Sequence, residues 1–287
     1  MREMTTGEYV EWYPEGYGMC FKVKRKIVDY RSKYQRIEIY ETTNFGKMLV
    51  IDGAIQLVEE GEASYHEVIV HPAMLAHPSP ERVLIIGGGD GGTLREVLKH
   101  PEVKRAVLVE IDPAVIHLSR LHLCIDRGSF DDERAEIVHD DGVRYLKSIN
   151  GSFYDVIIVD STDPVRHAKN LFTEDFYKCA KDVLREPGII VTQAGSLYPL
   201  TNDFINTFNS MKAVFENTQI LLSPVFGLAS PWGFLVGVKG KLDFEHVDMR
   251  RARMLDLRFY DAEMHKFFLF LPKSVRKKLD GIVEGPP

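Results

Sequence analysis

The chain has 287 residues, of which 45% are hydrophobic and 27% are charged. This composition can bury one large core or two smaller ones and argues against a disordered chain. The formal net charge of −6 argues against a nucleic-acid partner, and no apolar run is long enough to cross a bilayer. The first residues lack the apolar core of a signal peptide. We therefore expect a cytoplasmic protein that binds neither nucleic acid nor a membrane.

Cysteine and histidine spacing argues against a metal site. The three cysteines are far apart and show no C-x-x-C spacing: Cys20, Cys124 and Cys179. Such isolated thiols predict neither a disulfide framework nor a structural zinc site. His66-Glu67 and His71 miss the H-E-x-x-H spacing of a zinc protease helix. We expect no bound metal.

The first part of the chain has the pattern of short strands. Apolar and polar residues alternate over 21–27 and again over 35–40. Asp52-Gly53 lies between two apolar runs and has the preferred composition of a two-residue hairpin turn, because both positions tolerate positive φ. Residues 1–60 are therefore predicted to form a small antiparallel β domain.

From residue 61 onward, short apolar runs alternate with amphipathic stretches of helical length. Strands are expected at 83–86, 106–109, 156–159 and 189–192, and helices at 93–100, 113–121 and 173–184. Runs that are apolar throughout suit parallel strands covered on both faces. Residues 61–287 are therefore predicted to form an α/β domain with a Rossmann-like, doubly wound sheet.

A glycine-rich loop follows the first strand of this predicted sheet. Gly87, Gly89 and Gly92 fit G-x-G-x-x-G, in which glycine permits a tight turn and close approach of a ligand. Glu110 ends the next strand, where a carboxylate can accept both hydroxyls of a ribose. Asp90 inside the loop would repel a pyrophosphate but attract a cation. The pattern indicates a cationic nucleoside rather than NAD.

Carboxylates also follow the next two strands. After the third strand come Asp141 and Gly142, and we expect Asp141 to meet an adenine amino group and Asp140 to be a solvated neighbour or helix cap. Asp160 and Asp163 follow the fourth strand. Such a pair can bind an alkylammonium, orient it and accept its proton before the nitrogen attacks. The pair predicts chemistry on an amine.

An acidic run precedes the glycine loop in the sequence. It surrounds Tyr65-His66 and contains Glu59, Glu60, Glu62 and Glu67. Charge runs usually form a solvated face or loop, and we interpret this one in that way.

Taken together, these segments resemble the spermidine/spermine synthases, which are polyamine aminopropyltransferases. The resemblance is nearly full length and includes Tyr34-Gln35, 52–56, Tyr65-His66-Glu67, 87–92, Glu110-Ile-Asp112, Asp141-Gly142, Asp160-Ser-Thr-Asp-Pro164, Leu171-Phe172, Phe259-Tyr260, His265 and Leu271-Pro272. It implies that decarboxylated S-adenosylmethionine is a co-substrate held by Gln35, His66, Asp90, Glu110, Asp141 and Gly142. It also implies that Asp160 is the general base and that Tyr65 and Asp163 help to hold the attacking amine.

The implied reaction is a direct displacement at the carbon bonded to the sulfonium sulfur, which releases 5'-methylthioadenosine. The sulfonium is a good leaving group, so the resemblance implies neither a cofactor nor a metal. It further implies a homodimer or homotetramer.

Departures from the family pattern bear on the acceptor. Spermidine synthases commonly carry Gly-Pro where this chain has Arg166-His167, and an acidic residue near Gln193. The distal anchors for putrescine are therefore expected to be missing. Small residues at Gly195 and Gly227 would also open the distal end of the site for a longer chain.

Several motifs are more similar to thermospermine synthases, namely His71-Pro-Ala, Thr192-Gln-Ala-Gly195 and Pro231-Trp-Gly-Phe234. We therefore expect spermidine to be the acceptor, with thermospermine or spermine as the product. Putrescine or agmatine is the alternative acceptor.

Two other functions remain open at this point. A methyltransferase that uses S-adenosylmethionine would share the class I methyltransferase-like fold, the glycine loop and the ribose acid. Asp90, the Asp160/Asp163 pair and the N-terminal hairpin domain argue against it. A non-catalytic polyamine-binding protein would bind the same ligands but transfer no group.

Overall fold

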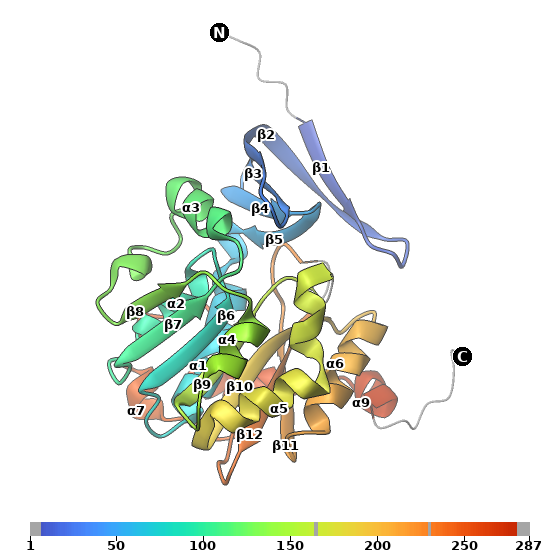
Figure 1. The fold of residues 1–287 in the computed structure, drawn as a ribbon. Coiled ribbons are helices and arrows are strands. Elements are labelled where there is room, and N and C mark those ends of the chain that lie inside the picture. The colour runs from blue at the N-terminus through green and yellow to red at the C-terminus, as the bar shows by residue number, and fades with distance from the viewer. Residues whose placement is uncertain (1–6, 164–165, 229–230, 280–287) are drawn as a thin grey trace.

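The computed structural model describes residues 7–163, 166–228 and 231–279, and within them the chain forms a five-stranded sheet and a seven-stranded sheet. The smaller sheet lies above one end of the larger one, whose two faces are covered by helices (Figure 1). Pro164, at the end of a segment that carries the family resemblance, lies outside the described residues, as do the side chains of Arg166 and His167.

The N-terminal sheet is an antiparallel meander, as predicted. Its strands follow one another in space as in sequence: β1 (Gly7–Trp12), β2 (Gly18–Arg31), β3 (Arg36–Thr42), β4 (Lys47–Ile51) and β5 (Ala54–Val58). Asp52 and Gly53 have φ angles of 50° and 90°, as a two-residue hairpin turn between β4 and β5 requires. The sequence did not reveal β1, because it is an edge strand without buried residues.

The larger sheet has the order β11-β12-β10-β9-β6-β7-β8. Its strands are β6 (Arg82–Gly87), β7 (Arg105–Val109), β8 (Ala135–Val138), β9 (Tyr154–Asp160), β10 (Leu184–Ser196), β11 (Asn217–Ser223) and β12 (Trp232–Lys239). Five neighbouring strands, β10, β9, β6, β7 and β8, are parallel to one another. The strand β12 is antiparallel to both of its neighbours, β10 and β11. The chain order reverses between β6 and β9, and ligands of open α/β sheets bind at such a switch point.

Helices cover both faces of this sheet (Figure 1). One core contains residues of α1 (Ala63–Ala76), α2 (Gly92–Leu98) and the C-terminal segment with η4 (Ala262–Met264) and α8 (His265–Phe268). The other contains residues of α4 (Gly142–Ser148), η3 (Arg166–Phe172), α5 (Glu174–Val183), α6 (Asn202–Lys212) and α9 (Lys273–Leu279). The remaining helices are η1 (Glu59–Gly61), α3 (Pro113–His122), η2 (Ser129–Asp131) and α7 (Met249–Ala252). The helices predicted near 93, 113 and 173 correspond to α2, α3 and α5.

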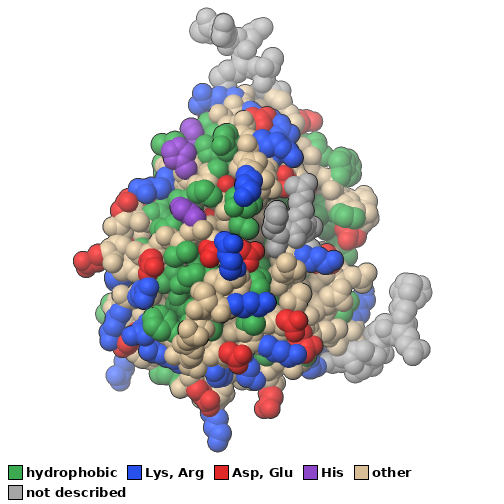
Figure 2. Space-filling view, viewed as in Figure 1, with side chains coloured by type: hydrophobic (Ala, Val, Ile, Leu, Met, Phe, Trp, Pro, Cys, Tyr) green, Lys and Arg blue, Asp and Glu red, His purple; other side chains and the backbone are tan. Residues whose placement is uncertain are grey.

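The surface view in Figure 2 shows acidic and basic side chains interspersed, without a broad basic area on that face. None of the described helices combines the length and apolar character that a bilayer crossing requires.

A buried carboxylate of α1 helps to hold the C-terminal segment in place. Glu67 is 0% exposed, and it accepts backbone N–H groups from Arg258 at 2.9 Å, Phe259 at 2.7 Å and Tyr260 at 2.8 Å. The prediction of a solvated acidic face is therefore wrong for Glu67, and it is also wrong for Glu62, which is 3% exposed. A segment about 190 residues away in sequence pairs with both carboxylates, and Glu62 is also paired with His66 and Arg95.

Replacement Glu67→Ala tests this attachment. Three backbone donors would lose a charged acceptor, and we expect the free energy of unfolding in urea to fall by about 3 kcal/mol, as for a lost buried hydrogen bond to a charged group. Glu60→Ala, in an exposed residue of the same acidic run, is the control. Equal stability of the two variants would contradict this role.

Candidate active site

A cavity of about 380 Å³ lies where β6, β7, β8 and β9 end and where the N-terminal sheet faces them. All nine residues predicted for the site line it: Gln35, Tyr65, His66, Asp90, Glu110, Asp141, Gly142, Asp160 and Asp163. The structure therefore brings together side chains that are spread over about 130 residues of sequence. They surround one space that is large enough for a small organic ligand.

The glycine loop brings the ends of β6 and β9 into contact. Gly87 has a φ of 84°, and a Cβ on it would overlap the backbone oxygen of Asp160. The next amide, Gly88 N–H, donates to that same oxygen at 2.7 Å. Glycine is thus required here for the approach of another backbone, which places Asp160 directly beside the loop.

An imidazole lies between two carboxylates at the base of the cavity. His66 Nδ1 is 2.7 Å from Glu62 Oε2, and His66 Nε2 is 3.3 Å from Asp90 Oδ1. A Cβ on Gly92 would overlap this ring, so the third glycine of the motif makes room for it. Burial alone lowers the pKa of His66, but Asp90 and Glu62 outweigh it and raise that pKa to about 10. The ring is therefore an imidazolium at neutral pH.

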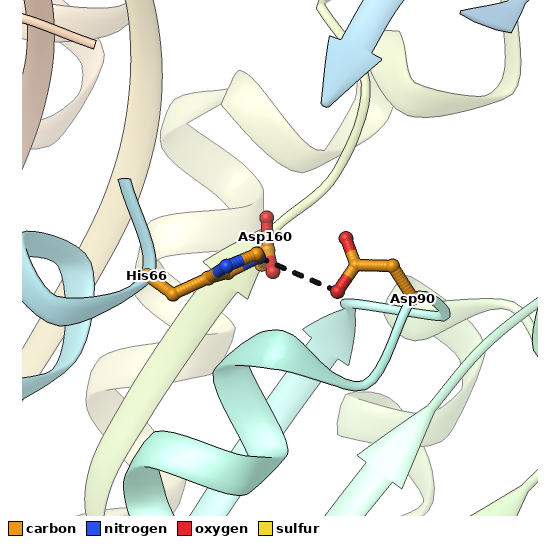
Figure 3. A group of neighbouring side chains, drawn as sticks. All are labelled: His66, Asp90 and Asp160. Carbon is orange, nitrogen blue, oxygen red and sulfur yellow. Dashed lines mark ion pairs between the residues drawn. The ribbon is translucent and has the colours of Figure 1, made fainter. Parts of the chain in front are cut away.

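The pKa of Asp90 is shifted in the opposite direction to that of His66. Burial opposes its ionisation, but the adjacent His66 and the Gly92 N–H, which donates to Oδ1 at 2.7 Å, lower the pKa of its carboxyl. Figure 3 shows His66 coming from α1, Asp90 from the loop after β6, and Asp160 from the end of β9. Their ligand atoms lie within 4.8 Å of one another. The two carboxylates, Asp90 and Asp160, are suited to binding an ammonium group, whereas the imidazolium of His66 has no lone pair to offer a cation.

Asp160 is the most enclosed carboxylate of the predicted pair, with 9% of its surface exposed. Tyr65 donates its hydroxyl to Oδ1 at 2.8 Å, and Thr93 donates to Oδ2 at 2.6 Å. Burial and the charge of Asp90 raise the pKa of Asp160, although both hydroxyls and His66 oppose the change. The result is a carboxylate that is more basic than usual. Burial raises the pKa of Tyr65 too, so its hydroxyl stays a donor.

Thr93 was not predicted from the sequence. Its position could have indicated the contact, because it lies in the first turn of α2, directly after the glycine loop. From there a hydroxyl can reach the end of the neighbouring strand β9.

The predicted ribose acid, Glu110, ends β7 and is buried. Its Oε1 accepts the Asp112 N–H at 2.9 Å, but burial prevails and raises the pKa of Glu110 to about 7. Gln35 lies nearby between β2 and β3, and its Nε2 donates to Asp112 Oδ2 at 3.1 Å. Asp112 also caps α3 through the Ala114 N–H. One buried aspartate thus connects the N-terminal sheet to the cavity wall.

Of the two alternatives expected for Asp140, the structure shows a partly exposed neighbour of the cavity rather than a helix cap. Asp141, not Asp140, caps α4, because its Oδ1 accepts the Arg144 N–H at 2.9 Å. Asp140 is paired with the Arg144 side chain, and both aspartates line the cavity. Gly142 allows α4 to start close against β6, since a Cβ there would overlap Ile86.

The outer end of the cavity is lined by Asp163, Gln193 and Trp232. Asp163 is accessible to solvent, yet desolvation of its carboxyl by the surrounding protein raises the pKa of that group. Gln193 is 1% exposed, and neither its side-chain nitrogen nor its oxygen makes a hydrogen bond of ordinary geometry within the described residues. Trp232 Nε1 is also buried and makes no hydrogen bond within the described residues. Buried polar atoms without partners are uncommon, so this end is suited to a polar ligand.

The two glycines expected to open the outer end behave differently. Gly195 has a φ of 93°, and a Cβ on it would lie 4.0 Å from Asp163 Oδ1, so its lack of a side chain leaves space beside that carboxylate. The prediction for Gly227 is wrong. A Cβ there would meet Val58 Cγ2 at 2.7 Å, so this glycine is required for packing against β5 and is not among the cavity-lining residues.

Comparison with known protein families gives two matches that together cover most of the chain. Residues 62–246 match the model described as spermine/spermidine synthase domain, and residues 8–59 match the spermidine synthase tetramerisation domain. A polyamine aminopropyltransferase of Thermococcus onnurineus is 54% identical over 96% of this chain and 97% of its own length. One from Pyrococcus abyssi is 51% identical over 95% of this chain and 99% of its own length.

Solved structures agree with these relatives. A spermidine synthase in complex with the transition-state analogue AdoDATO is 36% identical, with a TM-score of 0.93 over 99% of both chains. The spermidine synthase of Thermotoga maritima is 36% identical, with a TM-score of 0.91 over 99% of this chain and 98% of its own. These matches exclude the methyltransferase and non-catalytic alternatives. The chain belongs to the spermine/spermidine synthase family of aminopropyltransferases.

Proposed function

We propose that this protein transfers the aminopropyl group of decarboxylated S-adenosylmethionine to spermidine, forming thermospermine or spermine and 5'-methylthioadenosine. The observation that carries the proposal is Asp160, a buried carboxylate of raised pKa next to Asp90. One carboxylate can accept a proton from an incoming amine while the other holds the cationic donor.

The donor is proposed to lie across the ends of β6, β7 and β8. Glu110 accepts the ribose hydroxyls, and Asp141 and Gly142 lie at the adenine end. Gln35, fixed by Asp112, closes the cavity from the N-terminal sheet. At the other end, the donor's ammonium group binds to Asp90, whose carboxylate is held by His66.

The acceptor amine is proposed to bind between Asp160, Asp163 and the Tyr65 hydroxyl. Asp160 accepts a proton from the ammonium group, and the freed lone pair attacks the methylene carbon bonded to sulfur. A C–N bond forms as the C–S bond breaks, and the bonding pair returns to sulfur, which leaves as a neutral thioether. The departing group needs no protonation, so this mechanism calls for neither a cofactor nor a metal.

The choice of spermidine is supported by the outer end of the cavity. No residue from Thr192 to Ser196 is acidic, so this stretch supplies no counter-ion for the second ammonium of a short diamine. Gln193 instead offers a buried amide beside Asp163, and its oxygen can accept an N–H from an amine further along the chain. Gly195 leaves space beside Asp163 for that chain.

A homodimer or homotetramer is part of the same proposal. Its support is the match of residues 8–59 to a tetramerisation domain, together with the exposed side chains of Val10 and Trp12 on the edge strand β1. An exposed apolar edge is suited to pairing with another copy.

Replacement Asp160→Asn tests the general base. The amide keeps the size and one acceptor for Tyr65 or Thr93 but cannot take a proton, and kcat should fall about 10²- to 10⁴-fold. Binding of 5'-methylthioadenosine should change by less than about threefold, because this ligand carries no reacting amine. Asp175→Asn, in an exposed residue of α5, is the matched control. An unchanged kcat for Asp160→Asn would contradict this assignment.

The acceptor is tested by turnover with putrescine, agmatine and spermidine at saturating donor. We expect kcat/KM to be at least about tenfold higher for spermidine, a difference of about 1.4 kcal/mol. Chromatography must separate thermospermine from spermine, because they are isomers of equal mass. A preference for putrescine or agmatine would overturn the choice of spermidine but not aminopropyl transfer.

The ribose contact predicts a pH dependence of product binding. Ribose hydroxyls donate to an ionised Glu110, whose pKa in the free protein is about 7, so affinity is lost as the pH falls through 7. The Kd of 5'-methylthioadenosine, measured by calorimetry, should be about tenfold higher at pH 6 than at pH 8. In Glu110→Gln the affinity should be lower and nearly independent of pH. A parent protein with a flat profile would argue against this contact.

A further inference from the structure

A single buried carboxylate behind the cavity joins three parts of the chain. Glu62, just before α1, accepts from His66 Nδ1 at 2.7 Å and from Arg95 Nη2 of α2 at 2.8 Å. Its other oxygen pairs with Arg258 of the C-terminal segment. All four groups are charged, because His66 is an imidazolium and its positive charge, with that of Arg95, lowers the pKa of Glu62 against the effect of burial.

The partners of Glu62 are themselves fixed. Arg95 donates through Nε to Glu96 at 2.7 Å and through Nη1 to the backbone oxygen of Ile125 at 2.6 Å. The backbone of Arg258 is held by Glu67. Glu62 therefore has little freedom to rotate, and a buried carboxylate that lost a partner would leave a charge poorly compensated.

This arrangement determines how His66 faces the cavity. With Nδ1 held by Glu62, the ring is oriented so that Nε2 reaches Asp90 Oδ1. That same oxygen also accepts the Gly92 N–H. Both interactions use Oδ1, so within the described part of the chain Oδ2 of Asp90 is the oxygen with capacity for a cation. The orientation of the Asp90 carboxylate thus depends on His66, and that of His66 depends on Glu62.

We propose that Glu62, held by Arg95 and Arg258, is a positioning residue that orients His66 and Asp90, so that the C-terminal segment completes the part of the cavity that binds the donor's amine. Arg258 lies beyond residues 62–246, which match the synthase domain. The proposal rests on the proposed function, in which Asp90, held by His66, binds that amine. It assigns Arg258 a role in donor recognition although its side chain is at the surface, 40% exposed.

The test compares two ligands that differ in the aminopropyl group. In Arg258→Met, the Kd of decarboxylated S-adenosylmethionine should rise about tenfold, the effect of weakening one hydrogen bond to a charged group. The Kd of 5'-methylthioadenosine, which lacks the amine, should stay within about twofold. General damage to the fold would weaken binding of both ligands together. The ratio of the two Kd values therefore reports the positioning of Asp90 rather than the stability of the protein.

Three further variants sharpen the result. Arg258→Lys keeps the charge and should recover most of the donor affinity. Glu62→Gln should change the ratio of constants in the same direction as Arg258→Met. Arg253→Met removes an exposed arginine of the same segment and should change neither constant.

The idea is overturned if Arg258→Met binds both ligands as the parent does, or weakens both equally. Failure of the proposed function would look different. In that case the parent itself would bind decarboxylated S-adenosylmethionine no more tightly than 5'-methylthioadenosine and would transfer no aminopropyl group.

Discussion

The close contact between the ends of β6 and β9 is the constraint on which the site depends. The sheet order reverses between these strands, and Gly87 pairs in register with Asp160. The two backbones approach so closely that only glycine fits at this position, and the Gly88 amide completes the contact. The glycine loop and Asp160, the proposed base, are thereby held next to each other. The rest of the cavity is arranged around this pair.

The second requirement is the burial of several carboxylates in one small volume. Asp90, Glu110 and Asp160 would repel one another if each were simply ionised, and the protein differentiates them instead. His66 lowers the pKa of Asp90, whereas burial raises the pKa values of Glu110 and Asp160. Carboxyl groups with pKa values driven apart can serve different purposes within one site. Here one is suited to holding a cation and another to accepting a proton.

Much of this could be predicted because parallel strands bring their carboxyl ends to one edge of a sheet. Once the apolar runs were recognised, Asp90, Glu110, Asp141 and Asp160 could be placed at that edge from sequence alone. Contacts made by distant segments could not be predicted. Glu62 and Glu67 have the pattern of a solvated acidic run, but distant residues pair with them: Arg95 and Arg258 with Glu62, and the backbone of residues 258–260 with Glu67. Gly227 was misjudged for a similar reason, since its neighbour Val58 belongs to the other sheet.

The electrostatics also couple the binding of the two substrates. The negative charge of Asp90 is one of the causes that raise the pKa of Asp160. A cationic donor bound at Asp90 neutralises that charge, and its own positive charge then favours ionisation of Asp160. The carboxylate form of Asp160 is the form that can bind an ammonium group and accept its proton. Occupation of the donor end therefore favours the carboxylate form of Asp160, and because such coupling is reciprocal, within the proposed mechanism each substrate strengthens binding of the other through this residue.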